Sequence, residues 1–291
     1  MTDTTISALA DPVREWERGA WCLAALALAA RGEAGSLTHA ARDVLEAAGV
    51  PEHTLASSPL TPAQIEALAS AGLLKTAGLL TGRDVSWADQ SDDALRAQGQ
   101  ASGIAAAMFA QFVVPNYPEL GARLAQPGAR MLDVGTGVGA LGAGFAIAFP
   151  ALSVTGIDVM PRVLELAQQT VAEAGLQERM ELRLQDVAAL DEEGVYDLAW
   201  LPAPFVPERA FTEGVRRIAR ALRPGGMVMI GHGRLEGPPV DDALTRLQTI
   251  AYGGTPIDGA AATDLLTELR LGDAKTLQTP PGAPGITVAF R

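Results

Sequence analysis

Residues 131–149 read MLDVGTGVGALGAGFAIAF. A short apolar stretch, 131–134, runs into a turn with three glycines, 135–139, and a second apolar stretch of helical length, 141–149, follows. Glycines at such a turn accept positive φ angles and let a ligand approach the backbone closely. The N-terminus of the following helix adds free N–H groups and positive potential. The stretch therefore predicts a strand, a ligand-binding turn and a helix.

Outward from this stretch, strands and helices alternate from residue 129 to the C-terminus. The predicted strands are 131–134, 152–157, 180–184, 196–201, 227–231, 274–279 and 286–290. The predicted helices are 141–149, 161–174, 207–222, 241–250 and 259–271. Such alternation indicates a parallel sheet with crossover helices. We therefore expect an α/β fold, a doubly wound, seven-stranded, mostly parallel Rossmann-like domain over residues 128–291.

Residues 1–127 have a different, mainly helical pattern. Asp11-Pro12 reads as the start of a helix over 13–30, and further helices are expected at 37–48, 62–71, 92–111 and 119–124. The stretches 72–75 and 78–82 read as two short strands around a turn. Helices followed by a small hairpin suggest a winged-helix-like domain, which we expect to serve in dimerisation or as a lid.

Three acidic residues recur once per strand–helix unit, namely Asp133, Asp158 and Asp186. Because the carboxyl ends of parallel strands meet at one edge, a single nucleoside could lie across all three. Asp158 could then accept hydrogen bonds from both ribose hydroxyls, and Asp186 could accept one from an adenine amino group. As alternatives, Asp158 caps the next helix and Asp186 is a solvated loop residue. Gly135, Gly137 and Ala140 also fit the looser dinucleotide fingerprint G-x-G-x-x-A.

On these residues the sequence resembles the class I S-adenosylmethionine-dependent methyltransferases. Residues 133–139 match the D-x-G-x-G-x-G turn of the family, and residues 222–226, LRPGG, match its L-x-P-G-G turn before the fifth strand. The resemblance covers residues 129–291 and implies S-adenosylmethionine as cofactor. The residues that it assigns to the cofactor are Asp133, Gly135, Thr136, Gly137, Gly139, Asp158, Val159, Asp186, Val187 and Leu201. The front segment is similar to the dimerisation region of small-molecule O-methyltransferases, which implies a homodimer.

The acceptor is expected to be a small, partly apolar molecule methylated at oxygen, of the kind found in secondary metabolism. Family members that methylate amide or base nitrogens carry [DN]-P-P-[YF] after the fourth strand, whereas this chain has Leu201 in the polar position. Candidate pocket residues are Tyr117, Trp200, Phe205 and Tyr252, with core packing as the alternative for each.

His232 follows the fifth predicted strand and is a candidate general base. A solvent-facing loop histidine is the alternative. The plant-type enzymes of the family place their catalytic histidine after the fourth strand, where this sequence has Glu208.

Charge and composition exclude several classes of function. The net charge of −12, with −6 in residues 1–127, argues against binding nucleic acid or an anionic membrane. Cys22 is the single cysteine and cannot form a zinc site with only three histidines, so no metal is expected. The longest apolar run, 20–30, is too short to span a bilayer. We expect a cytoplasmic enzyme.

Three rival functions stay open at this point. The first is carbon or sulfur methylation, or a use of the same cofactor without methyl transfer, such as cyclisation. The second is an NAD(P)-dependent oxidoreductase, because the glycine turn fits both cofactors. The third is a ligand-sensing winged-helix regulator.

Overall fold

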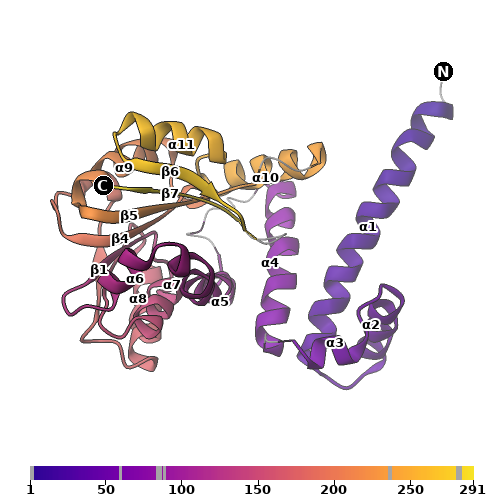
Figure 1. Ribbon diagram of the computed structural model, residues 1–291. Helices are drawn as coiled ribbons and strands as arrows, with labels where there is room; N and C mark the ends of the chain where they lie inside the picture. The colour runs from indigo at the N-terminus through magenta and orange to yellow at the C-terminus, as the bar shows by residue number, and fades with distance from the viewer. Residues whose placement is uncertain (1–2, 59–60, 83–86, 88–89, 235–237, 280–283) are drawn as a thin grey trace. The chain divides into compact units, whose positions relative to one another are not determined.

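The computed structural model describes residues 3–58, 61–82, 87, 90–234, 238–279 and 284–291 (Figure 1). The chain divides into two compact units. The first comprises Met1–Val85 and Ser91–Gln98, and the second comprises Ser86–Gln90 and Gly99–Arg291. Residues 99–127 therefore pack with the sheet, whereas the sequence analysis grouped them with the front helices.

The first unit consists of helices in its described residues. These are α1 (Asp3–Arg31), α2 (Ser36–Ala47), α3 (Glu52–Ala56), α4 (Pro62–Leu80) and the start of α5 (Asp92–Met108). Helix α1 packs against α2 and α4, and a small apolar cluster around Ala25, Ala41 and Leu45 joins α1 to α2. An ion pair of 2.6 Å between Arg31 and Glu66 links α1 to α4.

Two predictions for this unit were wrong. The stretches 72–75 and 78–82 do not form a hairpin, because α4 continues through them to Leu80. Leu and Ala dominate this segment and favour helix, and the Thr76 hydroxyl bonds back to the carbonyl of Gly72 within the helix. Helix α1 begins at Asp3 and contains Pro12, and Asp11 pairs with Arg14 instead of capping the helix.

The second unit is built on a seven-stranded sheet in the order β3-β2-β1-β4-β5-β7-β6. Strands β1 to β5 run parallel, and β7 runs antiparallel to both β5 and β6. Their bounds are β1 (Arg130–Val134), β2 (Ser153–Asp158), β3 (Met180–Leu184), β4 (Tyr196–Pro202), β5 (Leu222–His232), β6 (Gly272–Leu277) and β7 (Gly285–Phe290). The predicted doubly wound, mostly parallel fold is confirmed.

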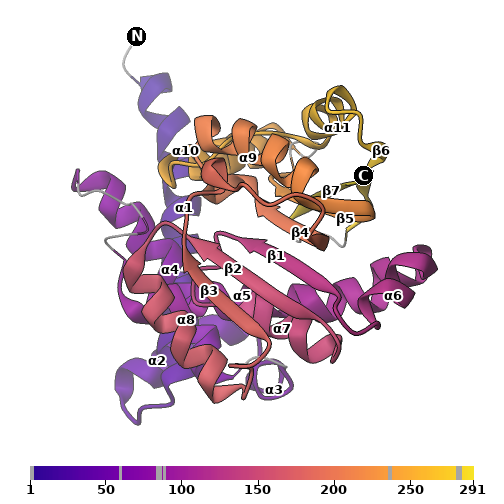
Figure 2. The ribbon, with the colours of Figure 1, turned by 90° about the vertical axis from the view of Figure 1, so that its left-hand side faces the viewer.

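Helices cover both faces of this sheet (Figure 2). On one face, α6 (Pro118–Leu124), α7 (Ala140–Ala148) and α8 (Pro161–Glu173) share a buried apolar cluster with the strands. On the other, α9 (Glu208–Ala221) and α11 (Gly259–Glu268) share a second cluster. Leu198 belongs to the first cluster and Ala199 to the second, as expected where successive side chains of a strand point to opposite faces. Helix α10 (Pro239–Ala251) follows β5.

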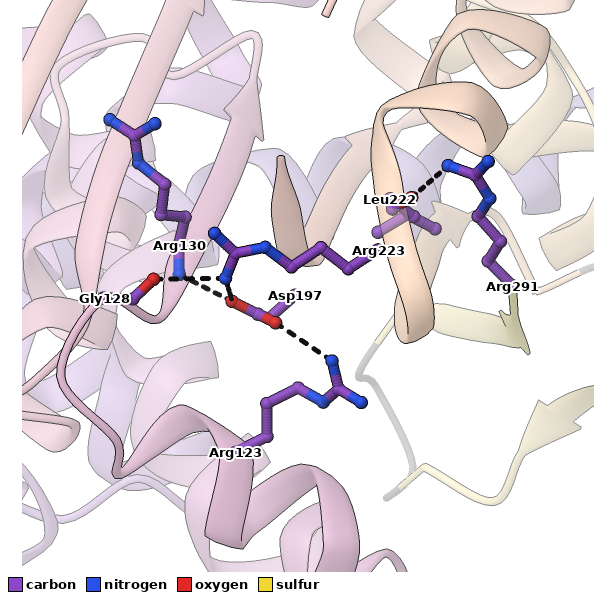
Figure 3. Close-up of polar contacts among 7 residues, drawn as sticks. All are labelled: Arg123, Gly128, Arg130, Asp197, Leu222, Arg223 and Arg291. Atoms are coloured by element: carbon purple, nitrogen blue, oxygen red, sulfur yellow. Dashed lines mark hydrogen bonds and ion pairs between the residues drawn. The ribbon is translucent and has the colours of Figure 1, made fainter. Parts of the chain in front are cut away.

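The amino ends of the central strands are joined by a buried carboxylate (Figure 3). Asp197, at the start of β4, pairs with Arg123 of α6 at 3.3 Å and with Arg223 of β5 at 2.7 Å. It also accepts a hydrogen bond of 2.9 Å from the backbone N–H of Arg130 in β1. Arg291 bonds to the carbonyl of Leu222 nearby. These contacts stabilise the edge of the sheet that lies opposite the glycine turn.

Candidate active site

The glycine turn between β1 and α7 has the backbone that its sequence predicts. Gly135, Gly137 and Gly139 have φ angles of 62°, 55° and 78°, a region that strongly favours glycine. The N–H of Thr136 donates to the carbonyl of Ile157 in β2 at 3.0 Å. A Cβ on Gly156 would lie 2.8 Å from the Thr136 hydroxyl. The turn is therefore held directly against the end of β2.

Asp133 is a buried carboxylate below this turn. Its Oδ2 accepts a hydrogen bond of 2.8 Å from the Thr136 hydroxyl, whereas its Oδ1 has no hydrogen-bond partner among the described residues. Burial raises the pKa of Asp133 to about 7, against the lowering effect of bonds from Thr136 and Gly142, and the nearby Asp158 raises it further. A ligand that brings positive charge to this point would stabilise the ionised form.

Asp158 ends β2 beside the turn, as predicted. Its Oδ2 accepts from the N–H of Gly137 at 3.0 Å and its Oδ1 from the N–H of Met160 at 2.9 Å. Burial raises the pKa of Asp158, and these backbone bonds oppose the rise. The N-cap of α8 is Met160, so the alternative role for Asp158 as that cap does not hold. Each carboxylate oxygen has two lone pairs, which leaves acceptor capacity for ribose hydroxyls.

Asp186 lies beyond the end of β3 and is exposed. Its Oδ1 accepts from the N–H of Ala188 at 2.8 Å and caps the 3₁₀ turn η4 (Val187–Ala189). Because β3, β2 and β1 are neighbours in the sheet, the three aspartates follow one another along its carboxyl edge.

Apolar side chains accompany the aspartates at this edge. Val159, directly after β2, is 63% exposed, and Leu184, at the end of β3, is 61% exposed. Val187 and Leu201 are instead buried in the core. Exposed apolar surface between acidic groups suits the flat face of a nucleobase.

Of the four aromatic pocket candidates, the structure brings two together. The rings of Phe205 and Tyr252 lie 5.9 Å apart. Trp200 packs against the sheet, where a Cβ on Gly231 would overlap its ring. Tyr117 lies 5.3 Å from the ring of Phe290. Phe290 pairs with Met227 of β5, which in turn pairs with Leu198 near the amino end of β4.

A third aromatic residue, Trp87, lies beside these two rings and was not predicted from the sequence. Its ring centroid lies 5.1 Å from Tyr252 and 5.2 Å from Phe205. Trp87 comes before the alternating part of the chain, so no strand-end pattern pointed to it. A tryptophan between two predicted helices, in a chain with only four, was the available signal.

His232 occupies the last position of β5 and is only 3% exposed. Its Nδ1 is 2.9 Å from the carbonyl of Gly233, and its Nε2 is 2.9 Å from the hydroxyl of Thr287 in β7. A carbonyl only accepts, so Nδ1 donates, and in the neutral ring Nε2 accepts from Thr287. The alternative of a solvent-facing loop histidine is wrong, because the ring is held within the sheet with both nitrogens bonded. Glu208 begins α9 and is exposed.

Residues 131–226 match the family described as methyltransferase domain. This segment is a methyltransferase domain. It contains the glycine turn, Asp133, Asp158 and Asp186. The predicted resemblance to class I methyltransferases is thereby confirmed for the domain and its fold.

Curated relatives of the methyltransferase domain include two kinds of enzyme. A release factor glutamine methyltransferase from Cereibacter sphaeroides is 32% identical over 145 residues, which cover 41% of this chain and 52% of the relative. A putative O-methyltransferase from Mycolicibacterium paratuberculosis is 33% identical over 130 residues, which cover 43% and 57%. The chain thus spans about half the length of the curated relatives it matches.

A solved structure with a similar fold is human N-acetylserotonin methyltransferase in complex with SAM. The TM-score is 0.69 at 16% identity, and the match covers 99% of this chain and 98% of that one. The similarity in fold therefore extends over the helical front part as well as the methyltransferase domain.

In the part of the chain that the structure describes, no group of three or more His, Cys, Asp or Glu side chains could hold a metal ion. In that same part of the chain, no helix is both long enough and apolar enough to cross a membrane.

Proposed function

We propose that the chain is an S-adenosylmethionine-dependent methyltransferase that acts at oxygen on a small, partly apolar molecule. The observation that carries this proposal is the row of aspartates at the carboxyl edge of a methyltransferase domain, with Asp158 bonded to the glycine turn itself. When bound, S-adenosylmethionine supplies a methyl group on a positively charged sulfur. The chain's own residues bind and orient the cofactor.

In this proposal each aspartate binds a different part of the cofactor. Asp133 and the turn 135–139 hold the methionine end, where the unpartnered Oδ1 of Asp133 suits a cationic amino group. Asp158 accepts from the ribose hydroxyls and Asp186 from the adenine amino group, while Val159 contacts the base. Val187 and Leu201 have buried side chains, so their predicted contacts are through the backbone.

The electrostatics of the turn favour this cofactor over a nicotinamide dinucleotide. Asp133 and Asp158 are close enough for their charges to interact. An anionic pyrophosphate on the turn would face both carboxylates, and like charges at close range repel. S-adenosylmethionine places positive charge there instead. Thermal stability with S-adenosylhomocysteine and with NAD tests the choice, because only the first should raise the melting temperature.

The acceptor class follows from position 201 and from the overall charge. The side chain of Leu201 is a hydrocarbon and is fully buried, so it presents no polar group to an acceptor nitrogen. The net charge of −12 opposes nucleic acid as a substrate. Product mass separates methylation, which adds one CH2 unit, from cyclisation without methyl transfer. Carbon-13 NMR of the product shows whether the new methyl group is on oxygen, carbon or sulfur.

We propose His232 as the general base. Its Nε2 is bonded to the hydroxyl of Thr287, which in turn lies 2.8 Å from the hydroxyl of Thr276. Thr276 is exposed. The two hydroxyls therefore offer a proton taken up by His232 one route to an exposed residue of β6.

We propose that two copies of the chain associate, with the helical front part as the main contact. Trp16 and Trp21 of α1 are 66% and 67% exposed. Helix α10 adds a row of exposed apolar side chains, namely Val240, Leu244, Leu247 and Ile250. Analytical ultracentrifugation should give the mass of a dimer, and Trp16→Glu with Trp21→Glu should shift it toward the monomer. A monomeric wild-type chain would contradict the proposal.

The enzyme is proposed to work in the cytoplasm, in keeping with its single cysteine. The regulator alternative is not favoured, because the described residues of the first unit contain no strand from which a wing could form.

A further inference from the structure

Trp87 and Gln90, both in the second unit, are attached on either side of the glycine turn. The N–H of Gln90 donates to the carbonyl of Trp87 at 3.3 Å, and the carbonyl of Gln90 accepts from Arg162 in the first turn of α8 at 2.8 Å. Arg162 follows β2, whereas the aromatic partners of Trp87 follow β4 and α10. In the sheet, β2 and β4 flank β1. The two attachments therefore lie on either side of the strand that ends in the glycine turn.

The two aromatic partners of Trp87 are fixed to each other by backbone contacts. The N–H of Thr255 donates to the carbonyl of Ala203 at 2.8 Å, and its hydroxyl donates to the carbonyl of Val206 at 2.8 Å. A Cβ on Gly254 would overlap the backbone of Pro204. These contacts join the 3₁₀ turn η5 (Ala203–Phe205) to the segment that follows α10. Phe205 and Tyr252 are thus held together at the carboxyl end of β4.

The three rings stand at different angles. Trp87 stacks on Tyr252 with an interplanar angle of 24° and meets Phe205 edge-on at 79°. All three are half-buried. In the part of the chain that the structure describes, the buried clusters of the sheet include Ala203 and Val206, on either side of Phe205, but none of the three rings. The three rings therefore form a group of their own at the end of β4, in contrast to Trp200, which packs against a cluster of the sheet.

We propose that Trp87, together with Phe205 and Tyr252, forms a wall against which a planar aromatic acceptor packs, which makes Trp87 a specificity-determining residue of this enzyme. Aromatic rings bind other rings by offset stacking and edge-to-face contact, and this wall offers both orientations. Its place beside the glycine turn puts the acceptor next to the methyl donor. This inference rests on the proposed methyltransferase function.

Calorimetric titration of the full chain, saturated with S-adenosylhomocysteine, tests the wall with 2-naphthol and cyclohexanol as probes. We expect 2-naphthol to bind at least about fivefold more tightly than cyclohexanol. Trp87→Ala should weaken 2-naphthol binding by about five- to tenfold and leave cyclohexanol binding and the Kd of S-adenosylhomocysteine within about twofold. Trp87→Phe should retain most of the affinity.

Phe112→Ala is the matched control, because Phe112 is an exposed aromatic residue of the same unit with no assigned role. Tyr252→Leu, which should also weaken 2-naphthol binding, keeps the test valid if Trp87→Ala fails to fold. The proposal is overturned if Trp87→Ala and Tyr252→Leu bind 2-naphthol as tightly as the wild type does. It is also overturned by a wild type that binds S-adenosylhomocysteine but not 2-naphthol. A wild type that fails to bind S-adenosylhomocysteine counts against the proposed function instead, and the wall is then judged by 2-naphthol binding alone.

Discussion

The replacement Asp133→Asn should change how the stability of the protein depends on pH. Burial raises the pKa of Asp133 from 3.8 to about 7. Between these values the folded state keeps a proton that the unfolded state has released, so stability falls as pH rises toward 7 and levels off above it. Each pKa unit corresponds to about 1.4 kcal/mol, so the wild type should lose about 4 kcal/mol of stability over the whole range. About 2–3 kcal/mol of this loss falls between pH 5 and pH 8.

The asparagine variant lacks this titration. Its amide nitrogen needs a partner at a buried position, which costs about 1–3 kcal/mol at every pH. That constant cost cancels when the difference in stability between variant and wild type is compared at two pH values. Relative to wild type, the variant should therefore gain about 2–3 kcal/mol on going from pH 5 to pH 8.

Urea unfolding followed by circular dichroism at pH 5, 6, 7 and 8 measures this difference. Titrating groups that do not interact with Asp133 behave alike in both proteins and drop out of the comparison. The exception is the neighbouring Asp158, whose charge raises the pKa of Asp133. A difference that stays constant across the series would refute the assignment of a raised pKa to Asp133. Saturation with S-adenosylhomocysteine should flatten the pH dependence of the wild type, because the α-ammonium group of this ligand, placed at the carboxylate, lowers the pKa of Asp133.

Three further substitutions test other parts of the structure. At 100 times its Kd, S-adenosylhomocysteine should stabilise the wild type by about 2.7 kcal/mol. In a thermal melt, Asp158→Ala should lose most of this stabilisation, whereas the exposed control Asp264→Ala should keep it. An unchanged stabilisation of Asp158→Ala would show that Asp158 does not bind the ribose. Asp197→Asn should lower the free energy of unfolding by about 1–3 kcal/mol in urea without weakening S-adenosylhomocysteine binding, and loss of binding would show that the two edges of the sheet are coupled. His232→Gln should lower kcat by about 10²-fold or more with any acceptor that is turned over, and an unaltered kcat would exclude His232 as the base.

The alternating pattern from residue 129 onward predicted the sheet because each element there is short, periodic and bounded by glycine or proline. The strand 180–184 was predicted with the bounds that the structure has. The same reasoning failed at residues 72–82, where a stretch with three glycines was predicted to form two short strands around a turn. The surrounding Leu and Ala residues keep that stretch helical.

The positions of the residues proposed to bind the cofactor were easier to predict from the sequence than those of the residues proposed to meet the acceptor. Asp133 and Asp158 lie where a glycine turn and a strand end place them, and local sequence encodes both features. The burial of His232 depends on its pairing with Gly285 of β7, and Tyr117 lies at the amino edge beside Phe290. Trp87 meets Tyr252 across 165 positions of sequence. Contacts of this kind are tertiary, and local pattern does not specify them.

The carboxylate of Asp197 also bears on how such an enzyme can diversify. Asp197 links α6, β1, β4 and β5 at the amino edge of the sheet. The loops at the carboxyl edge, where the cofactor is proposed to bind, take no part in these contacts. Substitutions around Phe205 and Tyr252 can then accumulate without unravelling the sheet. A library randomised at that end should retain a high proportion of folded members, which makes this chain a practical starting point for engineering new acceptor preferences.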